Sequence, residues 1–195
     1  MKMDDKIIKE IESGNLVIMP TDTIYGIVAD ATKEDVIKKV FEAKERSLDK
    51  PLLILISNEQ MLKEYVLEIP KIVNKIMKEY WPGPLTILFK KSSKVSNLLT
   101  ANSPFVAIRM PKDERLIRIM NKINKPLIAT SANISSHTPI TDLSQVEPRM
   151  KEKISCMIDG GIVNKDASTL IKIENNKVKI IREGSLATKI TKEWM

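Results

Sequence analysis

Segments with helical patterning alternate with strand-like segments along almost the whole of this chain. Apolar residues recur at helical spacing in five otherwise charged stretches, at residues 4–13, 32–46, 57–66, 70–80 and 113–123. Short apolar runs typical of buried strands lie among them, at residues 16–19, 51–56, 85–91, 105–110 and 127–130. Two alternating runs around Asn175 and Asn176 add a predicted β-hairpin. This order predicts an α/β fold with a mixed sheet.

The length and composition predict a single domain over residues 1–195, because 43% hydrophobic content is enough for one well-packed core in a chain of this size. Two helices begin with capping signals, at Thr32 and in the segment 57–66. Cys156 is the one cysteine and lies in an apolar run, so we expect it to pack in the core. The amino-terminal segment has no apolar signal core, and no apolar run could span a bilayer, which predicts a soluble, cytoplasmic protein.

A formal net charge of +7 favours an anionic partner, such as a nucleotide, a nucleic acid or an acidic surface. The charge alone does not choose among these, because lysines on solvated helix faces are common. Aromatic residues make up only 4% of the chain, which is few for stacking single-stranded nucleic acid.

The usual nucleotide-binding motifs do not occur in this sequence. It has neither a G-x-x-x-x-G-K-[ST] loop nor a G-x-G-x-x-G turn after a strand, so any nucleotide must be held by other groups. The one histidine, His137, has no cysteine or histidine at ligand spacing. We therefore predict no zinc site and no serine–histidine triad, and expect His137 to be a loop residue without a role in proton transfer.

Polar side chains gather instead at the ends of apolar runs. Lys44, Arg46 and Lys50 lie where a predicted helix ends and a strand begins, a place where cations either meet a phosphate or complement the helix dipole. Ser131 and Asn133 of "IATSAN" follow another apolar run, where a plain turn is the alternative.

The stretch "PTDTIYGIVADA" at residues 20–31 places a hydroxyl cluster directly after the apolar "LVIM". A loop that leaves a strand end is a common ligand site, because the scaffold is rigid there and backbone groups are free. Arg109 stands in an apolar, strand-like run, where a guanidinium is costly unless it is paired. We therefore expect a carboxylate or a phosphate beside Arg109.

Seven short motifs occur in an order and spacing that resemble a known family. They are "PTDTIYGI", "KERSLDKPL", "WPGPLT", "AIRMP", "SAN", "IDGG" and "ST" with the later "REG". They resemble the YrdC-type threonylcarbamoyl-AMP synthases, and the resemblance runs from about Val17 to Ser185. The resemblance implies a twisted open sheet with flanking helices around a concave, positively charged cavity, in the short, single-domain (TsaC-like) form.

The resemblance also implies a reaction in which L-threonine, bicarbonate and ATP give L-threonylcarbamoyl-adenylate and pyrophosphate. Mg²⁺ is expected with the ATP. A tRNA-modifying transferase complex would then use the product to make threonylcarbamoyladenosine, and weak binding to tRNA is a further expectation. Such a reaction needs positioning and electrostatic stabilisation rather than an enzyme nucleophile, which suits a site without a catalytic histidine or cysteine.

The family's site residues carry over by motif onto positions of this sequence. For ATP the resemblance implies Lys44, Arg46, Lys50, Ser131, Asn133, Thr141 and Arg182. For L-threonine it implies Thr23, Arg109, Ala129 and Ser168. The chain departs from the family pattern in the loop after "SAN" and at Leu55, Pro139, Ala167 and Glu183, which bear on threonine selectivity and on loop closure over ATP.

Two other functions stay open from the sequence. One is a YciO-like relative that binds RNA or a nucleotide in the same fold without chemistry, although the retained Lys44, Arg46, Ser131 and Asn133 argue against it. The other is a carbamoyl-adenylate module of the hydrogenase-maturation type. Such modules normally stand beside zinc-finger segments, and this chain has one cysteine.

Overall fold

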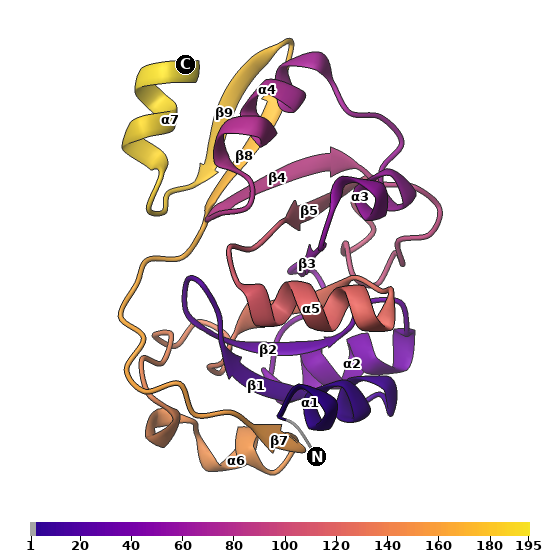
Figure 1. Cartoon of the computed structure of the whole chain (residues 1–195), viewed down its shortest axis with the longest axis vertical. Helices are drawn as coiled ribbons and strands as arrows, with labels where there is room; N and C mark the ends of the chain where they lie inside the picture. The colour runs from indigo at the N-terminus through magenta and orange to yellow at the C-terminus, as the bar shows by residue number, and fades with distance from the viewer. Residues whose placement is uncertain (1–2) are drawn as a thin grey trace.

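A computed structural model describes residues 3–195, and its nine strands form a single sheet (Figure 1). The strand order is β7-β1-β2-β6-β3-β5-β4-β8-β9. The strands are β1 (Val17–Pro20), β2 (Tyr25–Asp30), β3 (Leu53–Leu55), β4 (Leu85–Lys90), β5 (Phe105–Arg109), β6 (Leu127–Ser131), β7 (Cys156–Met157), β8 (Thr169–Glu174) and β9 (Lys177–Arg182).

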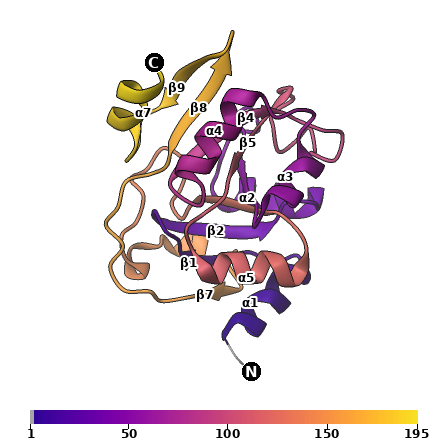
Figure 2. The same cartoon turned by 45° about the horizontal axis from the view of Figure 1, so that its top comes forward.

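Both kinds of strand pairing occur, so the predicted α/β fold with a mixed, open sheet is confirmed. The pairs β1–β2, β2–β6, β3–β6, β4–β5 and β8–β9 are antiparallel, whereas β1–β7, β3–β5 and β4–β8 are parallel. Strands β7, β1 and β2 lie at one end of the molecule and β8 and β9 at the other (Figures 1 and 2).

Helices flank the sheet and divide its side chains between two cores. They are α1 (Met3–Glu12), α2 (Glu34–Ala43), α3 (Glu59–Tyr65), α4 (Lys71–Tyr80), α5 (Glu114–Ile123), α6 (Pro148–Lys151) and α7 (Ala187–Trp194), with a 3₁₀ turn η1 (Leu143–Gln145). In β1, Val17 and Met19 pack with α1 and α5, while Ile18 between them packs in the larger core with α2, α3 and α4. Figure 2 shows α1 and α5 lying together. Within residues 3–195, no helix combines the length and the apolar character needed to cross a membrane.

One strand differs from the sequence expectation. Residues 25–30, expected as a loop, form β2, and all six are buried. Gly26 lies so close to β6 that an added Cβ would be 3.3 Å from the carbonyl oxygen of Thr130. The β1–β2 connection is therefore a tight turn over residues 21–24, which places its hydroxyl groups at the end of two paired strands.

The capping signals are confirmed at one helix and wrong at the other. Asn58 caps α3, since its side chain accepts a hydrogen bond from the backbone N–H of Met61. At α2 the cap position falls on Lys33, whose side chain makes no capping bond. Thr32 lies one residue before the cap position, and its hydroxyl donates to the carboxylate of Asp30 at 2.6 Å, a charge-assisted hydrogen bond.

The hairpin and the cysteine lie where the sequence predicts them. Asn175 and Asn176 form the β8–β9 turn with φ of 51° and 60°, a backbone region that asparagine tolerates better than most residues. Cys156 is buried in β7.

The connection from β7 to β8, residues 158–168, runs along one side of the molecule and joins the two ends of the sheet (Figures 1 and 2). Tyr25 holds its start, because its phenol accepts from the backbone N–H of Gly160 at 2.9 Å and donates to the carbonyl of Gly161 at 2.8 Å. At its end, the backbone N–H of Ser185 donates to the carbonyl of Ala167 at 3.3 Å, and Gly184 lies so close that a Cβ there would collide with the same carbonyl. The segment is therefore anchored at both ends beside the sheet.

Candidate active site

A cavity of about 660 Å³ is lined by residues of the sheet, by the loops at its strand ends and by Ala167 and Ser168 at the end of the connection 158–168. Its volume lies in the range typical of small-molecule sites. Its wall includes the β1–β2 turn, the loop after α2, the ends of β5 and β6, and the start of β8 with the end of β9.

The charged side chains that line this cavity are all cationic, namely Arg46, Arg109, Lys172 and Arg182. Among the described residues that line it there is no carboxylate, histidine or cysteine. Across residues 3–195, no group of three or more histidine, cysteine, aspartate or glutamate side chains is arranged to hold a metal ion. The cavity therefore suits an anionic ligand, because its lining offers hydrogen-bond donors and positive charge.

The structure brings most of the candidate residues together. Those that line the cavity are Thr23, Arg46, Arg109, Ala129, Ser131, Ser168 and Arg182. The other candidates do not line it, and these are Lys44, Lys50, Asn133 and Thr141.

Lys44 is directed at the backbone rather than at the cavity. Its side chain is 1% exposed, and its Nζ donates to the carbonyl of Ser131 and, at 2.7 Å, to that of Asn133. Burial, and next the charge of Arg46, lowers the pKa of Lys44 to about 7. The lysine thus ties the end of α2 to the "SAN" loop, and a direct contact with phosphate stays a prediction.

The remaining candidates outside the cavity lie around it. Asn133 donates to the carbonyls of Ile134 and His137, at 2.8 and 2.6 Å, and its Oδ1 is buried without a partner among the described residues. Thr141 is half-buried in the following loop, and Lys50 is exposed in the loop after α2, where its carbonyl accepts from the side chain of Arg46.

His137 lies in the loop after β6, as predicted. Its Nδ1 is 2.8 Å from a carboxylate oxygen of Glu147. Arg46 lines the cavity, where its Nε donates to the carbonyl of Lys50 at 3.0 Å and its Nη2 to that of Pro51 at 2.9 Å. These bonds fix the guanidinium at the cavity wall.

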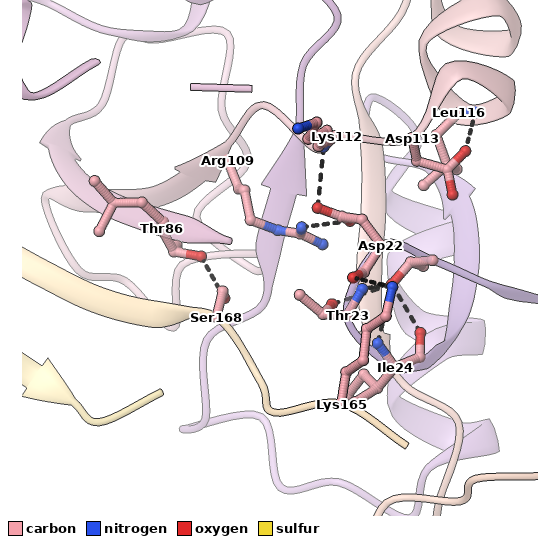
Figure 3. A network of polar contacts seen from close by, with 12 residues as sticks. Asp22, Thr23, Ile24, Thr86, Arg109, Lys112, Asp113, Leu116, Lys165 and Ser168 are labelled. Carbon is pink, nitrogen blue, oxygen red and sulfur yellow. Dashed lines mark hydrogen bonds and ion pairs between the residues drawn. The ribbon is translucent and has the colours of Figure 1, made fainter. Parts of the chain in front are cut away.

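Arg109 is paired with a carboxylate of the same chain. Its Nη1 is 2.6 Å from Oδ1 of Asp22, and the two side chains are 4% and 8% exposed (Figure 3). Oδ2 of Asp22 accepts from the backbone N–H of Lys112 at 3.0 Å. The Nε of Arg109 is buried without a hydrogen-bond partner among the described residues. The expected partner is therefore present as Asp22, and Arg109 still has donors to spare.

The threonines of the β1–β2 turn form a hydroxyl pair. Oγ1 of Thr21 donates to the carbonyl of Ile24 at 2.7 Å and lies 3.1 Å from Oγ1 of Thr23. Because Thr21 is used within the turn, Thr23 is the hydroxyl with capacity left for a ligand.

A second hydroxyl pair lies across the cavity at the start of β8. Oγ of Ser168 is 2.7 Å from Oγ1 of Thr86 and accepts from Nη2 of Arg182 at 3.0 Å (Figure 3 for the pair). Burial, and next the charge of Arg109, lowers the pKa of Arg182. The two arginines thus line one cavity and lie near enough for electrostatic repulsion between them.

Sequence reasoning missed Asp22, Thr86 and Lys172. The first two stand inside quoted motifs, "PTDT" and "WPGPLT", so their motif membership was an available signal. Among the departures from the family pattern, Pro139 and Ala167 line the cavity. Leu55 does not, because it is fully buried in the core under α5.

The sequence also matches a known protein family. The family model for Sua5, YciO and YrdC proteins, described as telomere recombination, matches residues 9–184. A threonylcarbamoyl-AMP synthase of Pyrococcus abyssi is 37% identical over 177 residues, which are 90% of this chain and 52% of that protein. A putative threonylcarbamoyl-AMP synthase of Methanocaldococcus jannaschii is also 37% identical over 177 residues, covering 90% of this chain and 83% of that one.

Solved structures give the same result. The crystal structure of P. abyssi Sua5 complexed with L-threonine has a TM-score of 0.89 and 34% identity, over 96% of this chain and 56% of that one. E. coli YciO shares the fold, with a TM-score of 0.83 at 17% identity over 94% of this chain and 89% of that chain. The chain spans about half the length of the P. abyssi relative. From the matched model and the identities, the chain belongs to the Sua5, YciO and YrdC family.

Proposed function

We propose that this chain is an L-threonylcarbamoyladenylate synthase. The amine of L-threonine takes up bicarbonate with loss of water and forms a carbamate. A carbamate oxygen then attacks the α-phosphorus of ATP, the bond to the β-phosphate breaks, and pyrophosphate leaves. The relatives in P. abyssi and M. jannaschii that are named for this activity support the assignment.

The observation that carries the proposal is a cavity lined by four cationic side chains and by hydroxyl groups, with no histidine, cysteine or carboxylate among its described lining residues to activate or supply a nucleophile. The reaction needs no covalent enzyme intermediate. It needs two substrates held in contact and stabilisation of the negative charge that gathers on the leaving pyrophosphate, which preorganised cations supply.

The two substrates would lie next to each other in the cavity, because Arg182 on the ATP side contacts Ser168 on the threonine side. Arg46, Ser131 and Arg182 would hold the phosphates and ribose of ATP, with Lys44, Lys50, Asn133 and Thr141 supporting or closing that side. Thr23, Arg109, Ala129 and Ser168 would hold L-threonine. The P. abyssi Sua5 structure with L-threonine supports an amino-acid site in this fold.

Mg²⁺ would arrive as part of the ATP substrate. The lining residues that the structure describes include no carboxylate, so the phosphates and water would supply most of its ligands. We also propose that residues 1–195 act as one domain, which the single continuous sheet supports. The product would pass to a tRNA-modifying threonylcarbamoyl transferase complex, and the net charge of +7 suits weak contact with tRNA.

The test is pyrophosphate release by the purified protein with ATP, Mg²⁺ and bicarbonate. We expect release only when L-threonine is also present. Valine should fail as a substrate by a wide margin, because it has no hydroxyl to meet the remaining hydrogen-bonding capacity of Thr23 and Ser168, whereas serine should be discriminated less. Release that is independent of threonine, or that responds to carbamoyl phosphate, would contradict the proposal. Nucleotide or RNA binding without release would favour the YciO-like alternative.

A further inference from the structure

We propose that Asp22 is a positioning residue for Arg109, which it orients for a ligand carboxylate in the cavity. The inference rests on the proposed function, since it deepens the account of the amino-acid end of that site. Asp22 was not among the candidate site residues, and its role follows from the contacts drawn in Figure 3.

The first support is where the two side chains lie. Arg109 lines the cavity, whereas Asp22 does not, so the carboxylate contacts the guanidinium from outside the ligand space. The contact of 2.6 Å is a charge-assisted hydrogen bond between two nearly buried groups. It uses one terminal nitrogen of Arg109 and leaves the other donors of the guanidinium unused by any described partner, including the buried Nε.

The second support is that Asp22 is itself fixed. Its Oδ2 accepts from the backbone N–H of Lys112, and its own carbonyl accepts from Nζ of Lys165 at 3.3 Å. The residue therefore joins the β1–β2 turn to the β5–α5 loop and to the connection 158–168. A carboxylate that is itself held by a backbone N–H fixes the position of the guanidinium nitrogen that it binds.

The third support is the charge around Arg109. Arg46, Lys172 and Arg182 line the same cavity, and their repulsion favours any rotamer that moves Arg109 away from them. Asp22 offsets one positive charge and holds the guanidinium in place. A ligand carboxylate would then meet donors already in position, so little side-chain entropy is lost on binding.

Two roles for Asp22 give opposite results when its charge is removed. If Asp22 only neutralised Arg109, Asp22→Asn would leave a freer cation and would tighten binding of a carboxylate ligand. If Asp22 orients Arg109, the same change must weaken binding. An asparagine cannot accept at both Arg109 and the N–H of Lys112, because one of its two terminal atoms is a donor.

The experiment measures L-threonine binding by calorimetry and the KM values for threonine and ATP in pyrophosphate release. We expect Asp22→Asn to raise the Kd and KM for threonine about tenfold or more, with the KM for ATP nearly unchanged. Asp22→Glu should also raise them, because it keeps the charge and moves the carboxylate. The matched control is Asp113→Ala, which removes the cap of α5 beside the same loop and does not touch Arg109, so threonine affinity should stay.

The outcomes separate this inference from the proposed function. A parent protein that neither binds threonine nor releases pyrophosphate with it would overturn the proposed function, and the inference with it. A parent that binds threonine, together with folded Asp22→Asn and Asp22→Glu variants of unchanged or higher affinity, would overturn the inference alone. If Asp22→Asn does not fold, Asp22→Glu decides the question. A loss of threonine affinity equally large in Asp113→Ala would also overturn it, because the effect would then belong to the loop.

Discussion

At the level of single residues, the charged side chains of the site already form hydrogen bonds or ion pairs within the chain. Arg109 binds Asp22, Lys44 binds two backbone carbonyls, and the donors of Arg46 reach the carbonyls of Lys50 and Pro51. Cations held by such bonds are costly to move, so they offer a ligand a fixed arrangement of charge. Two predictions follow from what these bonds imply.

The first concerns Lys44 and pH. Its pKa of about 7 lies below the ordinary 10.5 because burial, and next Arg46, disfavours the ammonium. Between these two pH values Lys44 is protonated in the unfolded chain and largely neutral in the folded one. The contribution of Lys44 to the free energy of unfolding therefore rises with pH across that window. Below the window Lys44 is charged in both states, and the full cost of the buried charge is present. We expect the free energy of unfolding of the parent minus that of Lys44→Met, measured by urea unfolding, to become more positive between about pH 7 and pH 10. A difference that is constant with pH would contradict it.

The second concerns Arg46. Arg46→Ala removes charge-assisted hydrogen bonds worth roughly 1.5 to 3 kcal/mol each. We expect ATP binding to weaken about tenfold or more while the protein stays folded, as checked by calorimetry and circular dichroism. Lys94→Ala, which breaks an exposed pair with Glu64, is the control and should leave ATP affinity unchanged. Equal affinity in Arg46→Ala and the parent would leave Arg46 as a structural residue of the loop.

At the scale of elements, the site depends on junctions where two segments approach closely. Gly184 follows β9 and lies against the segment that leads into β8, where a side chain has no room. Ser168 and Arg182 meet at this junction. The glycine therefore controls the spacing of two cavity residues without touching the cavity itself.

We expect Gly184→Ala to destabilise the protein by about 1 to 3 kcal/mol, because the new methyl group overlaps the backbone of Ala167 and Ser168. The displaced junction should also reduce pyrophosphate release. Urea unfolding and the release assay measure the two effects. Glu183→Ala, at the exposed neighbouring position, is the matched control. A Gly184→Ala protein as stable and active as the control would show that the junction yields freely.

Local patterning explains which parts of this architecture were predictable. Apolar periodicity is a property of neighbouring residues, so it located most helices and strands, and strand ends pointed to Thr23 and Ser131. It missed β2, because Gly26 and the adjacent hydroxyls are typical of a loop. It also gave no sign that Arg109 meets Asp22, 87 residues away, since that contact depends on the strand order of the sheet.

At the scale of the whole molecule, a net charge of +7 and a cavity lined by cations act together on ligands of different charge. ATP carries several negative charges, whereas threonine is a zwitterion with no net charge at neutral pH. Dissolved salt screens the attraction for ATP far more than the local contacts of threonine.

We therefore expect the Kd for ATP to rise several-fold between about 0.05 and 0.5 M NaCl, while the Kd for threonine changes little. Calorimetric titrations of each ligand at both salt concentrations measure this. A potassium glutamate series controls for chloride binding. Parallel changes for the two ligands would indicate a general effect of salt on the fold rather than electrostatic attraction into the cavity.

The strand order also bears on how the protein is made. Thr23 leaves the ribosome early, whereas Ser168 and Arg182 on another wall of the cavity lie at the two ends of the β8–β9 hairpin, and β8 can pair with β4 only after residues 169–174 have been synthesised. A nascent chain released before β8 has no complete cavity, so substrate cannot stabilise it, and its unpaired β4 edge is open to aggregation. Premature termination should therefore yield insoluble fragments rather than weakly active enzyme.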